Sequence, residues 1–544
     1  MKKIYLTLIA LITVFTACTD QFADYNTDKK HPANVPGESL FSNAQKEMSD
    51  YVNNTNVNIN IFKLMSQYWT ETTYTDEANY DLITRNIPAN IYLRLYMRVL
   101  TDLKRSDSLI RTKPVIFPDV ENPVKQNKLQ MIEIMDVYVY SQLVDIFGAV
   151  PYSEALNPNN VYPKYDDGVT IYKDLFARLD MALSKLDVNA ESFGSSDIYY
   201  GGDVAAWIKF GNSLKIRMAI TVSDASDASL HATSKAALES AATKCFSSND
   251  DDCMLKYVTS APNYNQLYAD LIATGRHDFV PANTIIDQMA SLTDPRLDSY
   301  FSSKVSVSFP IKNNKQQVDT MFVEVPVLMY YKDGTKALLT PDSVLDVYSN
   351  TNKFGIIIPQ ADTIREPSYY LGGQFGYSSP FGQCSHIADV IQKPDFPGIM
   401  LTYTEVQFYL AEAAERGYSL PKTAEAYYNE GIKSSFAFWG TSGVASYLAD
   451  PKIAYTTATG TWKQKIGLQS WIANYTRGME AYNTWRRLDY PIFNIPELVE
   501  SYNDIPVRFT FPVNEQTLNA DKYKAAATAI GGDLITTKIF WDKY

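Results

Sequence analysis

The chain of 544 residues carries a formal net charge of −12, and 46% of its residues are hydrophobic. This is enough apolar material for a large buried core, arranged either as several domains or as one helical solenoid with insertions. The acidic balance argues against nucleic acid as a partner, because proteins that bind nucleic acid present basic surfaces.

The N-terminal segment indicates export. Lys2 and Lys3 precede an apolar run from Ile4 to Phe15, which has the length of a signal-peptide core and is too short for a transmembrane helix. The run ends in Thr16-Ala17-Cys18, which resembles the bacterial lipobox, and this resemblance makes Cys18 the lipidated first residue of the mature chain. The alternative is an ordinary secretory signal cleaved near Ala17. We therefore assign residues 1–17 to a signal peptide and residues 18–36 to a polar, lipidated tether.

Helical periodicity dominates residues 37–250. From Lys128 to Phe147, apolar side chains recur every three or four residues, as in a helix with one buried face. Asp203 is a good N-cap for the helix that follows it. Further helices are expected at Leu40 to Tyr51, Ile59 to Trp69, Ile91 to Val99, Ile171 to Leu186, Trp207 to Met218 and Lys235 to Lys244. Such successive helix pairs predict a repeat-like helical scaffold.

Residues from about 250 to 400 interrupt this rhythm. Lys304 to Phe309, Met321 to Tyr331 and Phe354 to Pro359 are rich in residues that favour strands, and they predict short hairpins inserted into the helical body. Residues 371–384 combine glycines with aromatic residues. Long ordered insertions on a rigid scaffold are common places for binding sites.

Cys245 and Cys253 flank the turn-like stretch SSNDDD. In an oxidising compartment they could close a small disulfide ring, and the alternative is two unconnected thiols.

Leu401 to Trp439 predicts two helices joined by a tight turn between Gly417 and Pro421. Its pattern of leucine, small residues and aromatic residues is similar to the tetratricopeptide repeat. Helices are expected again at Trp462 to Tyr475 and Met479 to Leu488, and the tail from Ile505 is expected to be extended. We interpret residues 37–544 as a single domain, with helical pairs at roughly 37–250 and 400–490 and the inserted region between them.

Searches for catalytic motifs find little. The four histidines are scattered, no paired-histidine zinc motif or phosphate-binding loop occurs, and no serine lies in a nucleophile elbow. Carboxylate pairs of the kind used in glycoside hydrolysis occur by chance in any acidic chain of this size. The sequence therefore predicts neither a metal site nor a cofactor, and favours a protein that is not an enzyme.

Aromatic residues form the strongest candidate for a functional site. The chain has 39 Tyr, 25 Phe and 7 Trp, and because each buried tyrosine hydroxyl needs a partner, many rings are expected at a surface or cleft edge. Flat rings stack on sugar rings or peptide side chains, and neighbouring polar groups bind hydroxyls or amides. The alternative is that Trp69 packs in the core and the tyrosines seal a surface. The candidate ligand-binding residues are Trp69, Tyr74, Asn79, Tyr80, Tyr264, Tyr268, Arg276 and Tyr377.

The chain resembles the SusD/RagB family of nutrient-binding outer-membrane lipoproteins, particularly its SusD-like branch. The resemblance is carried by Thr16-Ala17-Cys18, YWTETTYTDEANY, VDIFGAVPYSEAL, WIKFGNSLKIRMAI, Asp294-Pro295-Arg296, LAEAAERG, GMEAYNTWRRLDYP and VRFTFPVNE. It implies a mainly α, SusD-like fold with about four tetratricopeptide-like helix pairs and a loop-rich half that carries short β-hairpins and the ligand site. It also implies a SusC-like TonB-dependent transporter as partner, and no catalysis.

The resulting hypothesis is a lipid-anchored protein of the cell surface and outer membrane that binds a nutrient oligomer and delivers it to that transporter. Glycans and oligopeptides are both open as ligands. The alternatives are an exported hydrolase that degrades glycans or peptides, and a purely structural helical-repeat partner of the transporter.

Overall fold

The computed structural model describes residues 35–302, 306–312, 318–324, 328–330, 336–338, 370–496 and 505–543. The predicted signal peptide, Cys18 with most of the tether, and the apolar run at residues 354–359 lie outside these ranges. Helices dominate the described residues, and strands are short, so the prediction of a mainly α fold is confirmed.

The first half is built from long helices. They are α3 (Gly37–Asn53), α5 (Ile87–Tyr92), α6 (Thr101–Thr112), α7 (Pro118–Phe147), α8 (Gly168–Lys185), α9 (Val204–Thr221) and α10 (Ala228–Ala241). A π-helical stretch, η1 (Leu93–Leu100), joins α5 to α6 without a break. Helix α7 starts ten residues earlier than predicted, because Pro118 occupies its first position, where no backbone N–H is needed. Asp203 caps α9 as expected, accepting hydrogen bonds from the N–H groups of Ala205 and Ala206.

The second half contains shorter helices between loops. They are α11 (Gln266–Tyr268), α12 (Asn283–Ser291), α13 (Leu297–Tyr300), α16 (Tyr403–Glu415), α17 (Ala424–Phe438), α18 (Val444–Ala449), α19 (Trp462–Ala473), α20 (Gly478–Leu488), α21 (Glu515–Leu518) and α22 (Ala520–Ala529). A π-helical turn, η4 (Ala269–Ala273), follows α11, and 3-10 turns occur at η2 (Gly194–Ser196), η3 (Asn249–Asp251) and η5 (Phe381–Gln383). Because α21 and α22 are helical, the prediction of a wholly extended tail is wrong.

The strands of the described residues form two-stranded antiparallel sheets. The pairs are β1 (Trp69–Glu71) with β5 (Phe279–Pro281), β2 (Val150–Pro151) with β3 (Tyr165–Asp166), β4 (Cys253–Leu255) with β12 (Gly398–Leu401), β6 (Phe301–Ser302) with β11 (His386–Ile387), β7 (Ser306–Lys312) with β8 (Val318–Glu324), and β9 (Leu328–Tyr330) with β10 (Lys336–Leu338). The last two pairs are the hairpins expected near residues 304–331. Several of the other pairs join segments far apart in the chain.

The predicted helix from Ile59 to Trp69 is wrong for most of its length. Only one turn, α4 (Phe62–Met65), is helical, and Gln67 then takes a left-handed backbone conformation with φ of 54°. Residues that follow pair with β5 instead of continuing the helix. The apolar run reflects burial on all sides rather than helical structure.

Sequential helices that pack against each other within the described part of the chain include α6–α7, α7–α8, α9–α10, α16–α17 and α19–α20. At α16 and α17, Thr402 and Glu405 form a capping box, and Gly417 follows α16 with φ of 78°. Gly431 lies against Phe408, where an added Cβ would come within 2.9 Å of the ring. Small residues therefore allow the close approach of the two helices that the pattern predicted.

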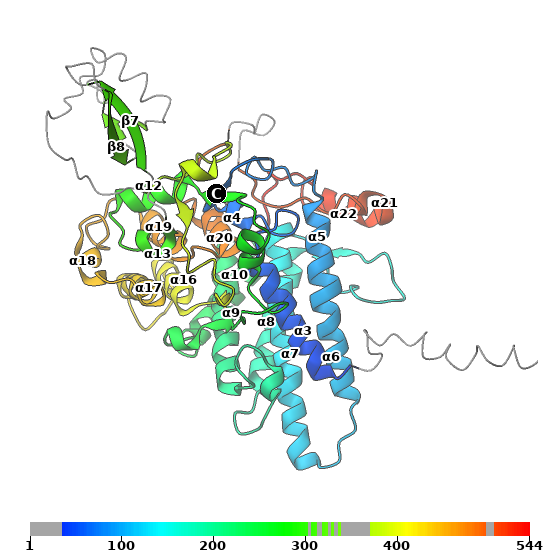
Figure 1. Ribbon diagram of the computed structural model, residues 1–544. Coiled ribbons are helices and arrows are strands. Elements are labelled where there is room, and N and C mark those ends of the chain that lie inside the picture. The colour runs from blue at the N-terminus through cyan, green and yellow to red at the C-terminus, as the bar shows by residue number, and fades with distance from the viewer. Residues whose placement is uncertain are drawn as a thin grey trace, which may run out of the picture.

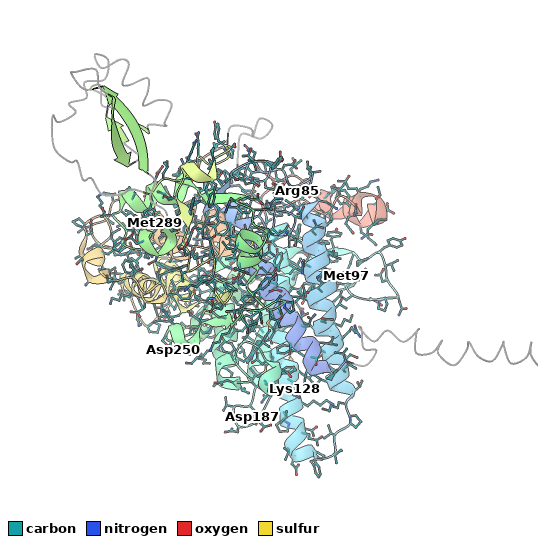
Figure 2. The ribbon with its side chains drawn as sticks, viewed as in Figure 1. Arg85, Met97, Lys128, Asp187, Asp250 and Met289 are labelled. Carbon is teal, nitrogen blue, oxygen red and sulfur yellow. The ribbon has the colours of Figure 1, made fainter. Side chains whose placement is uncertain are left out.

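Figure 1 shows the long helices α3, α6 and α7 extending away from the loop-rich part around α12 and α13. In Figure 2, Lys128 and Asp187 lie towards the lower end of the molecule, and Arg85 and Met289 lie towards its upper end.

A buried ionic network ties these helices together. Arg217 of α9 donates to both carboxylate oxygens of Glu480 on α20, at 3.1 and 3.0 Å, and to Asp145 of α7 at 3.0 Å. Gln142 of α7 and Tyr409 of α16 also donate to Glu480, at 2.9 and 3.3 Å. Burial alone would raise the pKa of Glu480, but the guanidinium groups of Arg217 and Arg477 outweigh it and hold that pKa below its ordinary value.

Candidate functional site

Three segments distant in sequence meet at the sheet formed by β1 and β5. Ser378 donates through its hydroxyl to the carbonyl of Thr72 at 2.7 Å, and Thr72 donates in the same way to the carbonyl of His277 at 2.7 Å. The N–H of Ser379 donates to the carbonyl of Glu71 at 3.2 Å. We call the surface made by residues 72–80, 274–278 and 374–386 the loop face. It brings the segment after Trp69 together with two parts of the inserted region, and the sequence places most of the candidate ligand-binding residues in these segments.

Tyr74 is the most prominent ring on the loop face. Its side chain is 73% exposed, and its backbone has φ of 54°, a conformation that is uncommon for a bulky residue. Four of the eight described non-glycine residues with positive φ fall between 67 and 86: Gln67, Tyr74, Tyr80 and Asn86. Such strained backbone persists only where surrounding contacts hold it, and it often occurs at binding sites.

Polar and aromatic groups share the loop face with Tyr74. Arg276 is 60% exposed and forms an ion pair with Asp278, Nε to Oδ2 at 2.6 Å. The pKa of Arg276 is raised mainly by its hydrogen bond and ion pair with Asp278, and the phenol of Tyr74 makes a smaller contribution. Beside them, Phe381 stacks between His277 and His386, with centroid distances of 4.1 and 3.8 Å. No site role was predicted for these three rings, because their stacking joins residues separated by about a hundred positions.

Two of the predicted stacking residues, Trp69 and Tyr80, have buried side chains rather than exposed rings. Trp69 is 0% exposed, and its indole N–H donates to the hydroxyl of Tyr475 at 2.9 Å. Tyr80 is 5% exposed, and its hydroxyl accepts a hydrogen bond from Gln67 at 3.2 Å. Trp69 lies in β1, whose three residues are all buried, and Tyr80 packs against Phe375 with ring centroids 6.1 Å apart.

The other predicted residues have different positions. Asn79 uses its amide to hold two loops together, donating to the carbonyls of Thr75 and Gly376 at 2.7 and 2.8 Å. Tyr377 is half-buried within the loop face. Tyr264 and Tyr268 pack edge to face, with centroids 5.3 Å apart, and the hydrogen bonds of their segment run to residues 394–396 rather than to the loop face.

A pair of carboxyl groups lies beneath the loop face. Glu71 accepts a hydrogen bond from the N–H of Ala78 at 2.9 Å, and Glu77 forms an ion pair with Arg85. Burial, together with the neighbouring Glu77 carboxylate, raises the pKa of Glu71 to about 9, so Glu71 is protonated at neutral pH and can donate to Glu77. Both side chains are buried. Because both carboxyl groups are buried and bonded within the protein, the pair is a structural contact rather than part of the exposed surface.

Replacing Glu71 with glutamine is expected to reduce the pH dependence of stability. In the wild type, stability falls as pH rises from 4.5 towards 9, because the unfolded chain releases the Glu71 proton and the folded chain keeps it. Ionisation of this group should lower the free energy of unfolding by about 4 kcal/mol between pH 5 and pH 8. Glutamine cannot ionise and still donates to Glu77, so the variant should lose less stability over that range. Urea unfolding at several pH values measures this, with the exposed Asp119→Asn as control. A pH profile identical to that of the wild type would contradict the assignment.

The cysteines depart from the predicted disulfide ring. Cys245 and Cys253 are both free and buried. Cys253 lies in β4, which pairs with β12, while the thiol of Cys245 contacts the carbonyl of Ala242 at 3.4 Å. Burial raises the pKa of the Cys245 thiol to about 11, so it is protonated at neutral pH. The two thiols belong to separate parts of the packed core.

Within the described ranges, no group of three or more His, Cys, Asp or Glu side chains is arranged to hold a metal ion. In the same ranges, no helix has the length and apolar character needed to span a membrane.

Comparison with known proteins gives a consistent result. A family described as starch-binding and associating with the outer membrane matches residues 29–317 and 354–512. Among solved structures, a chitin-binding protein is similar with a TM-score of 0.71 and 22% identity, covering 94% of this chain and 100% of that chain. A SusD homologue from Bacteroides thetaiotaomicron has a TM-score of 0.68 and 20% identity, covering 94% and 100%. A chitin-binding SusD homologue from Flavobacterium johnsoniae has a TM-score of 0.67 and 21% identity, covering 93% and 97%. A search of curated proteins found no match. At these identities the solved structures show a shared fold.

Proposed function

The chain belongs to the SusD-like family, whose members are described as starch-binding and associating with the outer membrane, and from this membership we propose an oligosaccharide-binding lipoprotein of the cell surface. In this proposal Cys18 carries the lipid anchor, the loop face binds the glycan, and a SusC-like TonB-dependent transporter receives it. Two structural relatives with the same fold are named as chitin-binding proteins, which favours a glycan over an oligopeptide as the ligand.

The exposed ring of Tyr74 is the observation that carries this proposal. Its flat face is accessible to solvent and held in a strained backbone conformation, so it is available for stacking before a ligand arrives. Arg276 and Asp278 lie within the same face and offer hydrogen-bond donors and acceptors to sugar hydroxyls. The stack of His277, Phe381 and His386 extends the aromatic surface beside them. An aromatic platform with polar neighbours fits a sugar ring, which has one apolar face and a polar edge.

Replacing Tyr74 with alanine is expected to weaken glycan binding by about five- to thirtyfold without unfolding the protein. Removing an exposed stacking ring at the centre of a binding surface typically costs about 1–2 kcal/mol of binding free energy. Isothermal titration calorimetry with malto-oligosaccharides and chito-oligosaccharides measures the effect. Tyr162→Ala is the matched control, because Tyr162 is also an exposed tyrosine and lies outside the loop face.

Three outcomes would contradict the proposal. One is glycan binding of equal strength in the Tyr74 and Tyr162 variants. Another is tight binding of oligopeptides with no binding of either glycan series. The third is release of shortened sugars during incubation, which would favour a hydrolase.

A further inference from the structure

A separate cavity of about 490 Å³ lies between α12, α17, α19 and the chain segments at residues 452–460 and 490–492. Its volume falls in the range of small-molecule sites, roughly 300–1,000 Å³. The same helix, α12, reaches both sites: the N–H of Asn283 at its start donates to the carbonyl of Gly373 beside the loop face, while Gln288 and Leu292 at its other end line the cavity. Met289, labelled in Figure 2, marks this end of α12. None of the residues that line the cavity belongs to the loop face, so the two are distinct.

The charge of the cavity is opposite to that of the whole chain. Its described lining includes Lys452 and Lys465 and contains no Asp or Glu, although the chain has 61 acidic residues. The ammonium group of Lys452 donates to the carbonyl of Ser291 at 3.0 Å, and that of Lys465 donates to the carbonyl of Tyr455 at 2.8 Å. An ammonium group has three donors, so each lysine retains two for a further acceptor. The nearby Asp450 is engaged with the backbone N–H of Lys452 at 2.8 Å.

Further polar groups on the lining are unused. Gln464 accepts a hydrogen bond from the N–H of Thr461 through its side-chain oxygen, which leaves its amide N–H₂ group without a partner among the described residues. The side-chain amide of Gln288 and the hydroxyl of Tyr490 likewise have no partner within the described part of the chain. The cavity thus combines several donors with two cations, an arrangement that suits a ligand rich in oxygen acceptors.

An apolar surface completes the cavity. Leu292, Leu468 and Ile492 line it together with the ring of Tyr490. Ile492 is 70% exposed at its position next to Pro491. A ligand with a flat apolar face and a negatively charged edge would use both kinds of lining. Neutral sugars would leave the two ammonium groups without a charged acceptor, whereas a simple inorganic anion would leave the apolar lining without a contact.

We propose that this cavity is a second binding site, for a small acidic saccharide of the uronic acid class. The carboxylate accepts hydrogen bonds from Lys452 and Lys465, the amide of Gln464 binds ring hydroxyls, and the apolar face of the sugar lies against Leu468 and Tyr490. This assignment does not depend on the function proposed for the loop face, because it uses none of the same residues.

Titration of the full mature chain with glucuronate and galacturonate, monitored by calorimetry, tests the assignment. Glucose serves as the neutral control and sodium sulfate as the inorganic control. We expect saturable uronate binding that is weakened about tenfold or more in Lys452→Met and in Lys465→Met, because each loses a charge-assisted hydrogen bond. Lys465→Arg should retain most of the affinity, and Tyr74→Ala should leave uronate affinity unchanged. Lys452 is exposed, so its variant keeps the fold even if Lys465→Met is less stable.

Several results would overturn the site. They are the absence of uronate binding to the wild type, equal binding of glucose and glucuronate, and uronate affinity unaffected by both lysine substitutions. Sulfate binding as strong as that of glucuronate would show that the cavity is only an anion site. Loss of uronate binding in Tyr74→Ala would place the ligand on the loop face instead.

Discussion

Replacing Glu480 with alanine is expected to lower the free energy of unfolding by about 4 kcal/mol. The carboxylate accepts hydrogen bonds from Arg217, Gln142 and Tyr409, so it joins α7, α9, α16 and α20 at one buried point. Without it, the guanidinium of Arg217 keeps Asp145 as its only carboxylate partner in the described core, while buried donors lose their acceptor. Breaking one side of a buried ion pair is costly because the remaining charge stays away from water.

Urea unfolding followed by circular dichroism measures this effect. Glu480→Gln keeps the size of the side chain and one acceptor oxygen. Its free energy of unfolding should therefore lie between that of the wild type and that of the alanine variant. The control is Asp107→Ala, which removes an exposed pair with Arg111 and should change stability by less than about 0.5 kcal/mol. Equal stability of Glu480→Ala and Asp107→Ala would show that the network does not hold the helices together.

Replacing Gly478 with alanine is expected to destabilise the protein by about 3 kcal/mol through crowding. Gly478 is the first residue of α20, and a Cβ there would lie 2.3 Å from the carbonyl carbon of Phe62 and 2.5 Å from the nitrogen of Lys63. Both contacts are backbone atoms, so α4 would have to shift as a whole. The adjoining strand β1 lies close to α4, and the shift should therefore also disturb the base of the loop face.

Thermal and urea unfolding would detect this loss. Gly382→Ala is the matched control, because a Cβ at Gly382 meets no atom within 4 Å. We expect the control to differ from the wild type by less than about 0.5 kcal/mol. If both alanine variants unfold at the same urea concentration, the backbone of α4 does not exclude a side chain at position 478.

The segment around Tyr74 shows what local sequence can and cannot predict. Trp69, Tyr74 and Tyr80 lie within twelve positions and present the same chemistry, yet Tyr74 is exposed and the other two rings are buried. The difference arises because β1 pairs with β5, about two hundred residues later, and places the ring of Trp69 against the core. No local pattern contains that partner, so the segment could be singled out as a candidate site, while which of its three rings is exposed could not be predicted.

For the helix pair α16 and α17, by contrast, local sequence was sufficient to predict the structure. In α16 and α17, the small residues, the capping box and Gly417 are all short-range signals, and the structure forms both helices where they were expected. The helix predicted at Ile59 to Trp69 failed because burial on every side produces the same apolar run as a helix does.

Local patterns in this chain were sufficient for its mainly helical architecture and its paired helices. These features depend on periodicity and capping, which act over a few residues. Tertiary contacts alone decided that Tyr74 faces solvent, that Cys245 and Cys253 are not bonded to each other, and that Glu480 joins four helices. They also decided that two lysines line a cavity whose lining, among the described residues, has no carboxylate. Each of these depends on burial and on partners from distant segments, and burial is a property of the folded chain rather than of any one stretch of it.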